Sequence, residues 1–260
     1  TQRWRYAEKS NALSLLEQQL PMALLRNQWS FTQMLNELEG ITKQQLEAFA
    51  RSLSSRVYIE SLLHGNFNQA MLDQVQHLIA GFSTCDCNYS DGAEYAVTEN
   101  VVNRQLRPAT LRSAQDNALL WYFPAAATTA VDSVSLMLAR EILHPKFYSE
   151  LRTQAQLGYL VGVDHRAWYQ RSGLTFWVQS PQASVDELHA AVNQFIGKHL
   201  QQGIATKPEF EKYRAALIVD LAKDDSDLVA RSRRYWYSLA LSDTAFTRKS
   251  MLLEAARALD

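Results

Sequence analysis

What this 260-residue sequence lacks excludes several classes of protein. Its two cysteines, Cys85 and Cys87, have one residue between them, a spacing badly suited to a mutual disulfide. Two thiols alone make no structural zinc site, and nothing indicates a disulfide-dependent secreted scaffold. No apolar run approaches the ~20 residues that span a bilayer. We therefore expect no membrane partner.

An excess of charge of one sign is also missing. The formal net charge is -1 at pH 7, so no general attraction to nucleic acid is expected. The run "RSRRYWY" mixes basic and aromatic residues, as surfaces that bind nucleic acid do. However, Asp227 lies four residues before Arg231, a spacing typical of ion pairs on a solvated helix face. We expect no nucleic-acid partner.

The common catalytic and cofactor motifs are absent as well. None of the six histidines has a second histidine or a carboxylate at the spacing of a helical zinc motif. The sequence has no G-x-S-x-G elbow, Walker loop or G-x-G-x-x-G fingerprint. We therefore predict no metal site, serine nucleophile or nucleotide site in this chain. His64 beside Gly65 is expected at a strand end, with a backbone partner.

The first 80 residues show a mainly helical pattern. Leu13, Leu16 and Leu20 share one helix face, Pro21 is expected to open a second helix that ends at Gly40, and Thr42 is expected to cap a third. One strand is then predicted in "RVYIESLLHGN", where apolar residues alternate. A further helix follows, with its apolar face listed as Met71, Val75, Leu78 and Ile79. The polar residues 81–103 are the best candidate for an interdomain connection.

The second part of the chain mixes strands and helices. "NALLWYF" predicts a strand, and the following helix has an apolar face formed by Val131, Val134, Leu138 and Ile142. His144-Pro145 is expected to interrupt it, and a short helix to restart at Phe147. A hairpin of strands 157–163 and 173–180 is predicted next, followed by three helices at 184–201, 206–223 and "DLVARSRRYWYSLAL". Helices around hairpin-linked strands indicate an α+β fold with an antiparallel sheet.

Arg152 and Tyr159 form the main candidate site. Arg152 closes the short helix, and Tyr159 follows in the strand, where it is expected to share a face with Leu157, Val161 and Val163. Arg offers a rigid fork of donors for carboxylate or carbonyl groups, and a Tyr hydroxyl can stabilise an oxyanion. The pattern alone favours the simpler interpretation of an Arg at a helix end beside a half-buried Tyr. Glycines 158 and 162 are expected to permit a close approach of another backbone.

Three stretches resemble a known family. "LHPKFYSELRTQAQLGYLV", "GLTFWVQS" and "SRVYIESLLHGN" are similar to the C-terminal half of the insulysin/pitrilysin (insulinase, M16) zinc metallopeptidases. The resemblance spans nearly the whole chain. It implies two partial copies of an α+β unit, of the four that form two bowl-like halves around a closed chamber. Residues 1–95 would be the later part of the third unit and residues 96–260 the earlier part of the fourth.

The resemblance also implies a site that is shared between two halves. The family binds zinc through a His-x-x-Glu-His motif and a distant Glu in its first unit, where a zinc-bound water attacks the peptide. This chain lacks the motif, so it would bind no cofactor itself, and zinc would lie in the missing N-terminal half. Arg152 and Tyr159 match the substrate-binding and catalytic Arg and Tyr of the last unit, which act in trans. The implied partners are that N-terminal half and peptide substrates.

Alternatives stay open at this point. A non-catalytic M16-like scaffold or interaction module would keep the fold without the chemistry, and a specialised processing peptidase, for example one that matures a peptide-derived cofactor, would differ in substrate. The chain starts without Met and without a signal-peptide pattern, and we interpret it as a piece of a longer soluble protein. The fragment alone is expected to be inactive and to self-associate. The sequence names neither the substrate nor the compartment, periplasm or cytoplasm.

Overall fold

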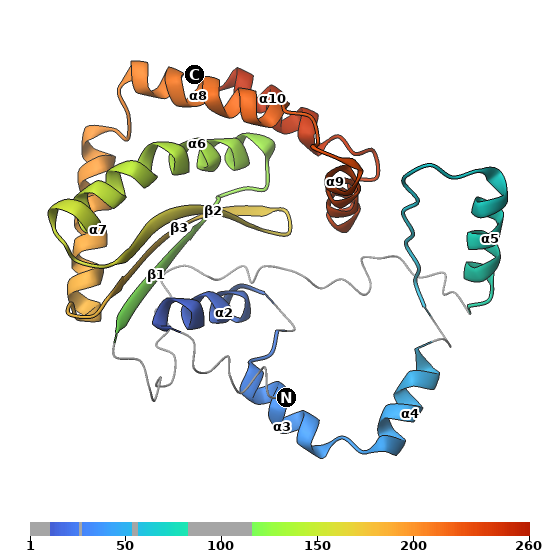
Figure 1. Ribbon diagram of the computed structural model, residues 1–260. Helices are drawn as coiled ribbons and strands as arrows, with labels where there is room; N and C mark the ends of the chain where they lie inside the picture. Colours follow the sequence, from blue (N-terminus) through green and yellow to red (C-terminus); the bar gives the residue numbers. More distant parts are fainter. Residues whose placement is uncertain (1–10, 26–27, 54–56, 83–115) are drawn as a thin grey trace.

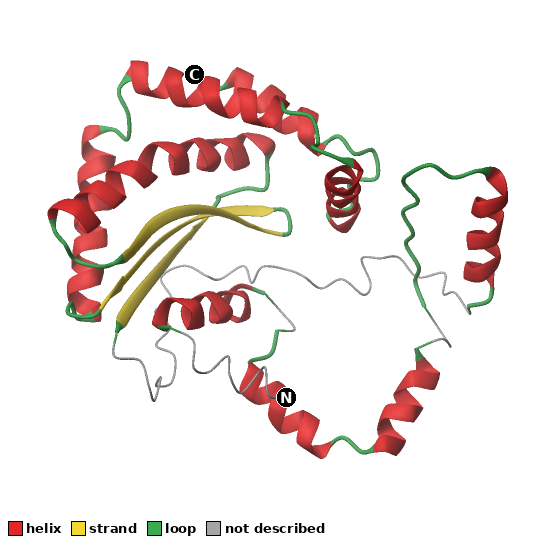
Figure 2. Cartoon of the chain, in the orientation of Figure 1, coloured by secondary structure: helices red, strands yellow, loops and turns green. Residues whose placement is uncertain are grey.

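A computed structural model describes residues 11–25, 28–53, 57–82 and 116–260. The helices of this part of the chain are α2 (Ala12–Leu24), α3 (Phe31–Gly40), α4 (Lys43–Ser52), α5 (Gln69–Ala80), α6 (Ala130–Phe147), the π-helix η2 (Tyr148–Gln154), α7 (Val185–Gln202), α8 (Lys207–Ala222), α9 (Leu228–Ala240) and α10 (Arg248–Ala258). The strands are β1 (Asn117–Pro124), β2 (Leu160–Trp168) and β3 (Arg171–Ser180). Figure 2 shows the mixture of helices and one sheet that confirms the α+β prediction.

The three strands form one antiparallel sheet in the order β1-β3-β2. Val178 in the central strand pairs with Leu119 on one side and Val161 on the other. The predicted hairpin is confirmed, but its first strand runs to Trp168 and not to residue 163. The polar residues expected at the tip are paired in β2, because a two-residue turn is enough to reverse an antiparallel pair.

The main core lies between the sheet and helices α6 and α7 (Figure 1). Phe176 of β3 packs edge-on against Phe147 of α6, with ring centres 5.3 Å apart. Phe147 meets Phe195 of α7 in the same way at 5.0 Å. Such edge-to-face pairs add ~0.5–1.5 kcal/mol each beyond the burial of their area. This aromatic cluster fixes the end of α6, from which η2 continues.

Helices α8 and α10 pack on the outer side of α6 (Figure 1). Val134, Leu138 and Ile142 are buried in this second cluster, as the apolar row predicts. Val131, the first residue of the predicted row, is exposed. Helix α6 therefore has apolar neighbours on two sides, the sheet and the outer helices.

Helix α2 covers part of the opposite face of the sheet. Its Leu20 and Leu24 are buried against Leu120 and Tyr122 of β1. The backbone N–H of Leu13, in its first turn, donates to the side chain of a strand residue across the interface. These contacts show that a segment from the first part of the sequence stabilises the sheet of the second part.

Both prolines expected at helix boundaries lie inside helices. Pro21 is within α2, the chain leaves that helix at Leu25, and α3 begins after Ser30, which caps it through its side chain. Pro145 is within α6, which runs on to Phe147. The predicted interruption at His144-Pro145 was wrong because the residues around it are buried on two sides, and this packing outweighs the ~3 kcal/mol local cost of proline.

The strand predicted within 57–63 was also wrong. Val57 forms an isolated bridge, and no regular strand follows over residues 58–63. A strand gains stability from a paired neighbour, which the alternating pattern alone does not supply. The helix beyond Thr42 is confirmed, with a capping box between Thr42 and Gln45. The connection predicted at 81–103, the boundary at 95/96 and both cysteines lie almost entirely or entirely outside the described residues.

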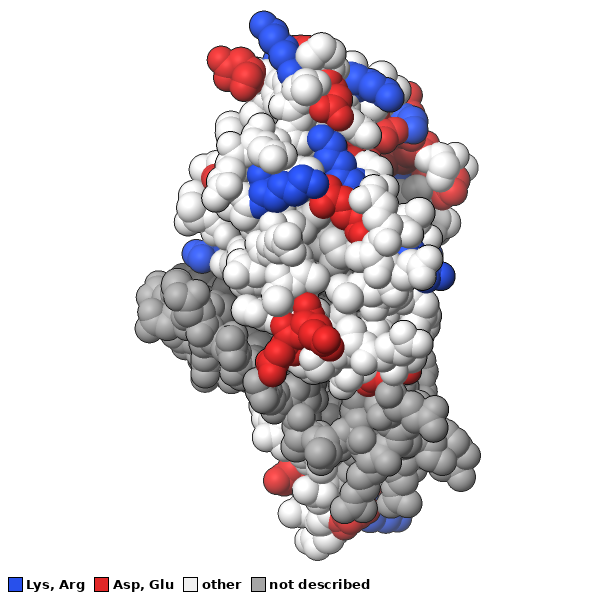
Figure 3. Space-filling model, turned by 90° about the vertical axis from the view of Figure 1, so that its left-hand side faces the viewer, with Lys and Arg blue, Asp and Glu red and all other residues white. Residues whose placement is uncertain are grey.

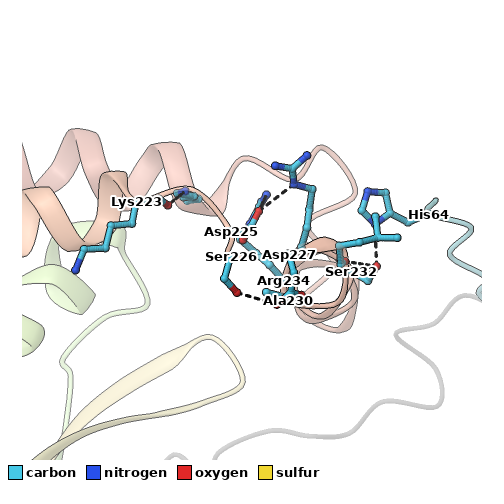
Figure 4. A network of polar contacts seen from close by, with 11 residues as sticks. His64, Lys223, Asp225, Ser226, Asp227, Ala230, Ser232 and Arg234 are labelled. Atoms are coloured by element: carbon cyan, nitrogen blue, oxygen red, sulfur yellow. Dashed lines mark hydrogen bonds and ion pairs between the residues drawn. The ribbon is translucent and has the colours of Figure 1, made fainter. Parts of the chain in front are cut away.

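Helix α9 is held by polar contacts with two segments (Figure 4). Asp225 accepts three hydrogen bonds from Arg234, at 3.0, 3.2 and 2.8 Å, and one from Arg231 at 3.3 Å. The expected pair of Asp227 with Arg231 was wrong, since the Asp227 side chain caps the helix by accepting from the Ala230 N–H. His64 does not pair with backbone at a strand end: its Nδ1 lies 2.8 Å from Ser232 Oγ.

The surface around α7 shows mixed charge. On the face seen in Figure 3, most of the described surface is white, blue and red side chains lie close together in its upper part, and a smaller red group lies below them. This view agrees with the near-zero net charge. Within the described ranges, none of the helices has the length and apolar character that a bilayer span requires.

Candidate functional site

The candidate site lies where α6 ends and the chain enters the sheet. The short helix predicted around Leu151 is the π-helix η2, which is continuous with α6. Single π-turns of this kind often occur at functional sites. Leu151 points into the core, and Arg152 is half-buried, with no hydrogen-bond or ion-pair partner among the described residues. The Arg152 guanidinium is therefore available to a ligand from outside this part of the chain.

Glu150 attaches η2 to α7. Its carboxylate accepts from Lys198 Nζ and from His199 Nε2, both at 3.0 Å. Partial burial raises the pKa of the Glu150 carboxyl, but the hydrogen bonds from Lys198 and His199 outweigh it, so the pKa lies below the ordinary value. The His199 ring also packs against the Phe195 ring, with centres 4.3 Å apart and the planes tilted by 48°. Glu150 thus joins the helix that carries Arg152 to the buried aromatic cluster.

A tight turn leads from η2 to β2. The N–H of Ala155 donates to Glu150 O and the N–H of Leu157 to Leu151 O, both at 2.9 Å. Gln156 in between has φ of 51°. Gly158, two residues after Gln156, lies directly against β3, where a Cβ would come within 2.5 Å of Gln179 O. This glycine confirms the predicted close approach of another backbone.

The second glycine of the motif has a different neighbour. At Gly162 the Trp177 side chain lies over the strand, in the space that a Cβ would occupy. At this position the glycine permits tight packing against the paired strand β3, through the Trp177 side chain. The Trp177 indole N–H donates to Asp164 at 3.0 Å, which keeps the ring flat on the sheet. The face opposite the core is thus partly covered by aromatic rings.

Tyr159 does not share the face predicted for it. Val161 and Val163 are buried in the core, whereas Tyr159 is 43% exposed and precedes the regular strand. Its hydroxyl donates to Asp116 Oδ2 at 2.5 Å and accepts from Gln179 Nε2. The period-two alternation applies only within a regular strand, and β2 begins at Leu160, after Tyr159.

The pKa values of this pair move in opposite directions. The hydrogen bond to the Asp116 carboxylate raises the pKa of Tyr159, since it stabilises the protonated phenol. The same bond, with that from Gln179, lowers the pKa of Asp116. The phenol is therefore protonated and the carboxylate charged at neutral pH. Tyr159 is therefore a hydrogen-bond donor, to Asp116 in this structure, and not a base.

The turn brings Arg152 and Tyr159 to its two ends, although no described contact joins their side chains. Asp116 and Gln179 were missed by the sequence interpretation. Asp116 is 43 residues from Tyr159, and only the pairing of β1 with β3 makes it a neighbour. A weak signal existed for Gln179, a polar residue that continues the strand "GLTFWVQS" on the face away from the core.

The chemistry of the site suits recognition of a polar main chain. A planar donor fork and a fixed hydroxyl can bind carbonyl, carboxylate or oxyanion groups. Across the part of the chain that the structure describes, no group of three or more His, Cys, Asp or Glu could hold a metal ion. These residues do not fit the zinc site of the resembled family, so no step is assigned to a metal on this chain.

Comparison with known proteins identifies the segment around this site. Residues 137–236 match the family described as PQQ synthase PqqF-like, C-terminal lobe domain 4. The match contains both ends of the turn, Arg152 and Tyr159. It also includes Gln179, but not Asp116.

Two curated relatives extend the comparison. A nardilysin-like protein of Arabidopsis thaliana is 25% identical over 219 residues, which cover 78% of this chain and 20% of the relative. Coenzyme PQQ synthesis protein F of Pseudomonas syringae pv. tomato is 38% identical over 86 residues, which cover 33% of this chain and 11% of the relative. The chain thus spans a fifth or less of the length of these two relatives.

Solved structures show the same fold. Pitrilysin matches with a TM-score of 0.76 and 18% identity over 99% of this chain and 28% of its own. The peptidase M16 inactive domain from Pseudomonas fluorescens matches with a TM-score of 0.59 and 14% identity over 99% of this chain and 62% of its own. Together, these matches show that the chain is similar to C-terminal regions of M16 peptidases and shares their fold.

Proposed function

We propose that this chain belongs to the non-zinc-binding C-terminal half of a zinc-dependent peptidase that degrades peptides in an enclosed chamber. The observation that carries this proposal is the display of Arg152 and Tyr159 at the ends of one turn, within the segment that matches the PqqF-like family. The partly exposed Tyr159 and the unpaired guanidinium, among the described residues, support a role towards an external ligand.

The two side chains have separate roles in this proposal. Tyr159 donates its hydroxyl hydrogen bond to the oxyanion that develops on the scissile carbonyl. Arg152 uses its planar fork to hold the substrate main chain, or a carboxylate, beside it. Neither group needs to change its charge at neutral pH. The reaction therefore uses this chain for positioning and for stabilising charge.

We propose that zinc is bound by the N-terminal half of the same polypeptide, which is then the partner of this chain. Residues 1–95 belong in this proposal to the later part of a third unit and residues 96–260 to the earlier part of a fourth. The lack of a suitable ligand group among the described residues supports catalysis in trans. On this basis the isolated fragment is inactive.

A second candidate function differs in substrate. The family match is described as PqqF-like, and the Pseudomonas relative is named for coenzyme PQQ synthesis. These names favour a specialised peptidase that processes the peptide precursor of a cofactor. Cleavage of such a precursor by the full-length protein, at a rate well above that of unrelated peptides of equal length, would support it. Equal rates would favour general peptide degradation.

A non-catalytic scaffold remains the alternative from a different class. The sequence of the N-terminal half of the full-length protein distinguishes a scaffold from a peptidase. An intact His-x-x-Glu-His motif in that half indicates a peptidase. Loss of that motif, with no hydrolysis of any peptide by the full-length protein, would favour the scaffold.

Tyr159→Phe in the full-length protein tests the proposed role. Removal of one oxyanion donor is expected to lower kcat about 10²–10³-fold with little change in KM, because the bond forms only in the transition state. Phe keeps the ring, so the melting temperature should change little. Tyr237→Phe is the matched control, since Tyr237 is 44% exposed on α9 and away from the turn.

Initial rates on a fluorogenic peptide, over a range of concentrations, separate kcat from KM. A normal kcat for Tyr159→Phe would leave Tyr159 as a packing residue and remove the basis of the proposal. An equal loss in Tyr237→Phe would indicate a general effect of removing a tyrosine hydroxyl.

A further inference from the structure

Gln179 is a buried amide at the centre of the site. It lies on β3, the middle strand, and its side chain is fully buried at 0% exposure. A buried amide without partners would cost ~1–3 kcal/mol, so its contacts are expected to have a purpose beyond filling space. The side chain points away from the main core, to the face of the sheet that α2 covers.

The orientation of this amide is fixed from one side by α2. The Leu13 N–H donates to Gln179 Oε1 at 2.9 Å. The first N–H groups of a helix have no partner within the helix. This bond therefore also gives one of the first N–H groups of α2 a hydrogen-bond acceptor. Reversal of the amide would place its NH₂ group against the N–H of Leu13, two donors facing each other. The NH₂ group must therefore point to the opposite side.

On that side the Gln179 amide contacts the side chains of Asp116 and Tyr159. Gln179 Nε2 donates to Asp116 Oδ2 at 2.8 Å and also to the Tyr159 hydroxyl. The hydroxyl in turn donates to the same Asp116 oxygen at 2.5 Å. Both amide hydrogens and the hydroxyl hydrogen are thus used. The Tyr159 oxygen is held from two directions while part of its ring remains exposed.

The backbone of Gln179 also contacts Tyr159. The N–H of Tyr159 donates to Gln179 O at 3.0 Å. Gly158, immediately before it, is the residue that lets the chain come this close, because any Cβ would overlap Gln179 O and Val178 Cγ1. Gln179 therefore fixes Tyr159 at both ends, the main chain and the hydroxyl.

We propose that Gln179 and Asp116 are positioning residues that hold the Tyr159 hydroxyl ready for the substrate, with α2 fixing the orientation of the Gln179 amide. This inference rests on the proposed function, since it concerns the same tyrosine. Tyr159 has one hydroxyl proton, so a developing oxyanion must replace Asp116 as its acceptor. Gln179 keeps the oxygen in place during that exchange, because its bond is to the lone pair and not to the proton.

A double-mutant cycle in the full-length protein tests the inference. Gln179→Met keeps a similar volume and removes the amide, and we expect kcat to fall by up to about 10²-fold through misplacement of Tyr159. In a Tyr159→Phe background the same change should cause no further loss, because a residue that acts through the hydroxyl has no effect once the hydroxyl is gone. Equal losses in both backgrounds would mean a structural role and overturn the inference.

Controls separate this test from that of the proposed function. Gln202→Met, at the exposed end of α7, should leave kcat unchanged. If Gln179→Met folds poorly, Asp116→Ala provides a second cycle at a half-buried position. Normal kcat in Tyr159→Phe would sink the proposed function. A normal kcat in both Gln179→Met and Asp116→Ala, with a large loss in Tyr159→Phe, would sink only this inference.

Discussion

The Tyr159 hydroxyl and the Arg152 guanidinium have different surroundings, although only seven positions separate them. Tyr159 is held by Asp116 and Gln179, whereas Arg152 has no described partner. A fixed donor costs little reorganisation when charge develops beside it. An Arg without a described partner can use both arms of its fork on a ligand. This difference suggests that Tyr159 acts on the transition state and Arg152 on substrate binding.

Arg152→Lys in the full-length protein is expected to lower kcat/KM about 10- to 100-fold, the equivalent of ~1.5–3 kcal/mol for hydrogen bonds to a charged group. Lys keeps the positive charge but cannot form two parallel hydrogen bonds. Stability should not change, since Arg152 has no described partner to lose. Arg257→Lys on the exposed side of α10 is the control. Unchanged kcat/KM would show that charge alone is sufficient.

At the residue level, the sequence predicts only part of the site. Arg152 and Tyr159 could be named because they lie in one short motif that resembles a family. Asp116 and Gln179 could not, because the distance between them and Tyr159 in the sequence is 43 and 20 residues. The face of Tyr159 was also beyond prediction. Alternation holds within a strand, and the turn at Gly158 places Tyr159 just outside it.

Among the elements, α6 and the predicted strand at 57–63 show why local patterns fail. Pro145 breaks an isolated helix, but here two apolar clusters bury the residues around it. The alternating residues after Val57 have the composition of a strand but are not paired as one. In both segments the deciding interaction is with residues far away in the sequence. The capping signal of Thr42 is local, and helix α4 begins where it predicts.

Helix α9 offers a test of pH dependence. Hydrogen bonding from Arg234 is the main cause that lowers the pKa of Asp225 from 3.8 to about 2. A carboxyl with a lowered pKa stabilises the fold fully above 3.8, and the stabilisation is lost as the pH falls towards about 2. Asp225→Asn should therefore reduce the free energy of unfolding at neutral pH, and its difference from the wild type should shrink below pH 3.8.

Urea unfolding of both proteins at several pH values measures this difference. Asp220→Asn is the matched control, because its ion pair with Lys223 is 64% and 67% exposed and should contribute little. A difference that persists unchanged at the lowest pH would contradict the role of the Asp225 charge. The loss would then come from packing alone.

For the molecule as a whole, the uneven burial of the helices is informative. Helices α6, α7 and α10 have buried residues on the core, whereas α4 and α5 have none. Leu46, Phe49 and Leu78 are each about 60–70% exposed. Figure 1 shows α3, α4 and α5 away from the sheet. Exposed apolar rows of this kind are typical of surfaces that pack against another part of a protein.

The isolated chain is therefore expected to self-associate as its concentration rises. Sedimentation velocity measures the oligomer distribution directly. Phe49→Glu on α4 should shift it towards the monomer, because the exposed ring of Phe49 would be replaced by a charge. Glu47→Gln on the same helix is the control for the altered charge. A chain that remains monomeric at every concentration would show that the exposed apolar side chains of α4 and α5 do not drive self-association.

The last prediction concerns catalysis by the molecule on its own. The isolated chain is expected neither to retain stoichiometric zinc nor to hydrolyse a fluorogenic peptide, because a metal site needs several ligands in one place. Within the described ranges no such group of residues exists. Metal content after purification without chelator and hydrolysis with and without chelator are the measurements. Stoichiometric zinc with chelator-sensitive hydrolysis would contradict the proposal that zinc is bound only by the N-terminal half. Activity that appears only when a separately expressed N-terminal half is added would support it.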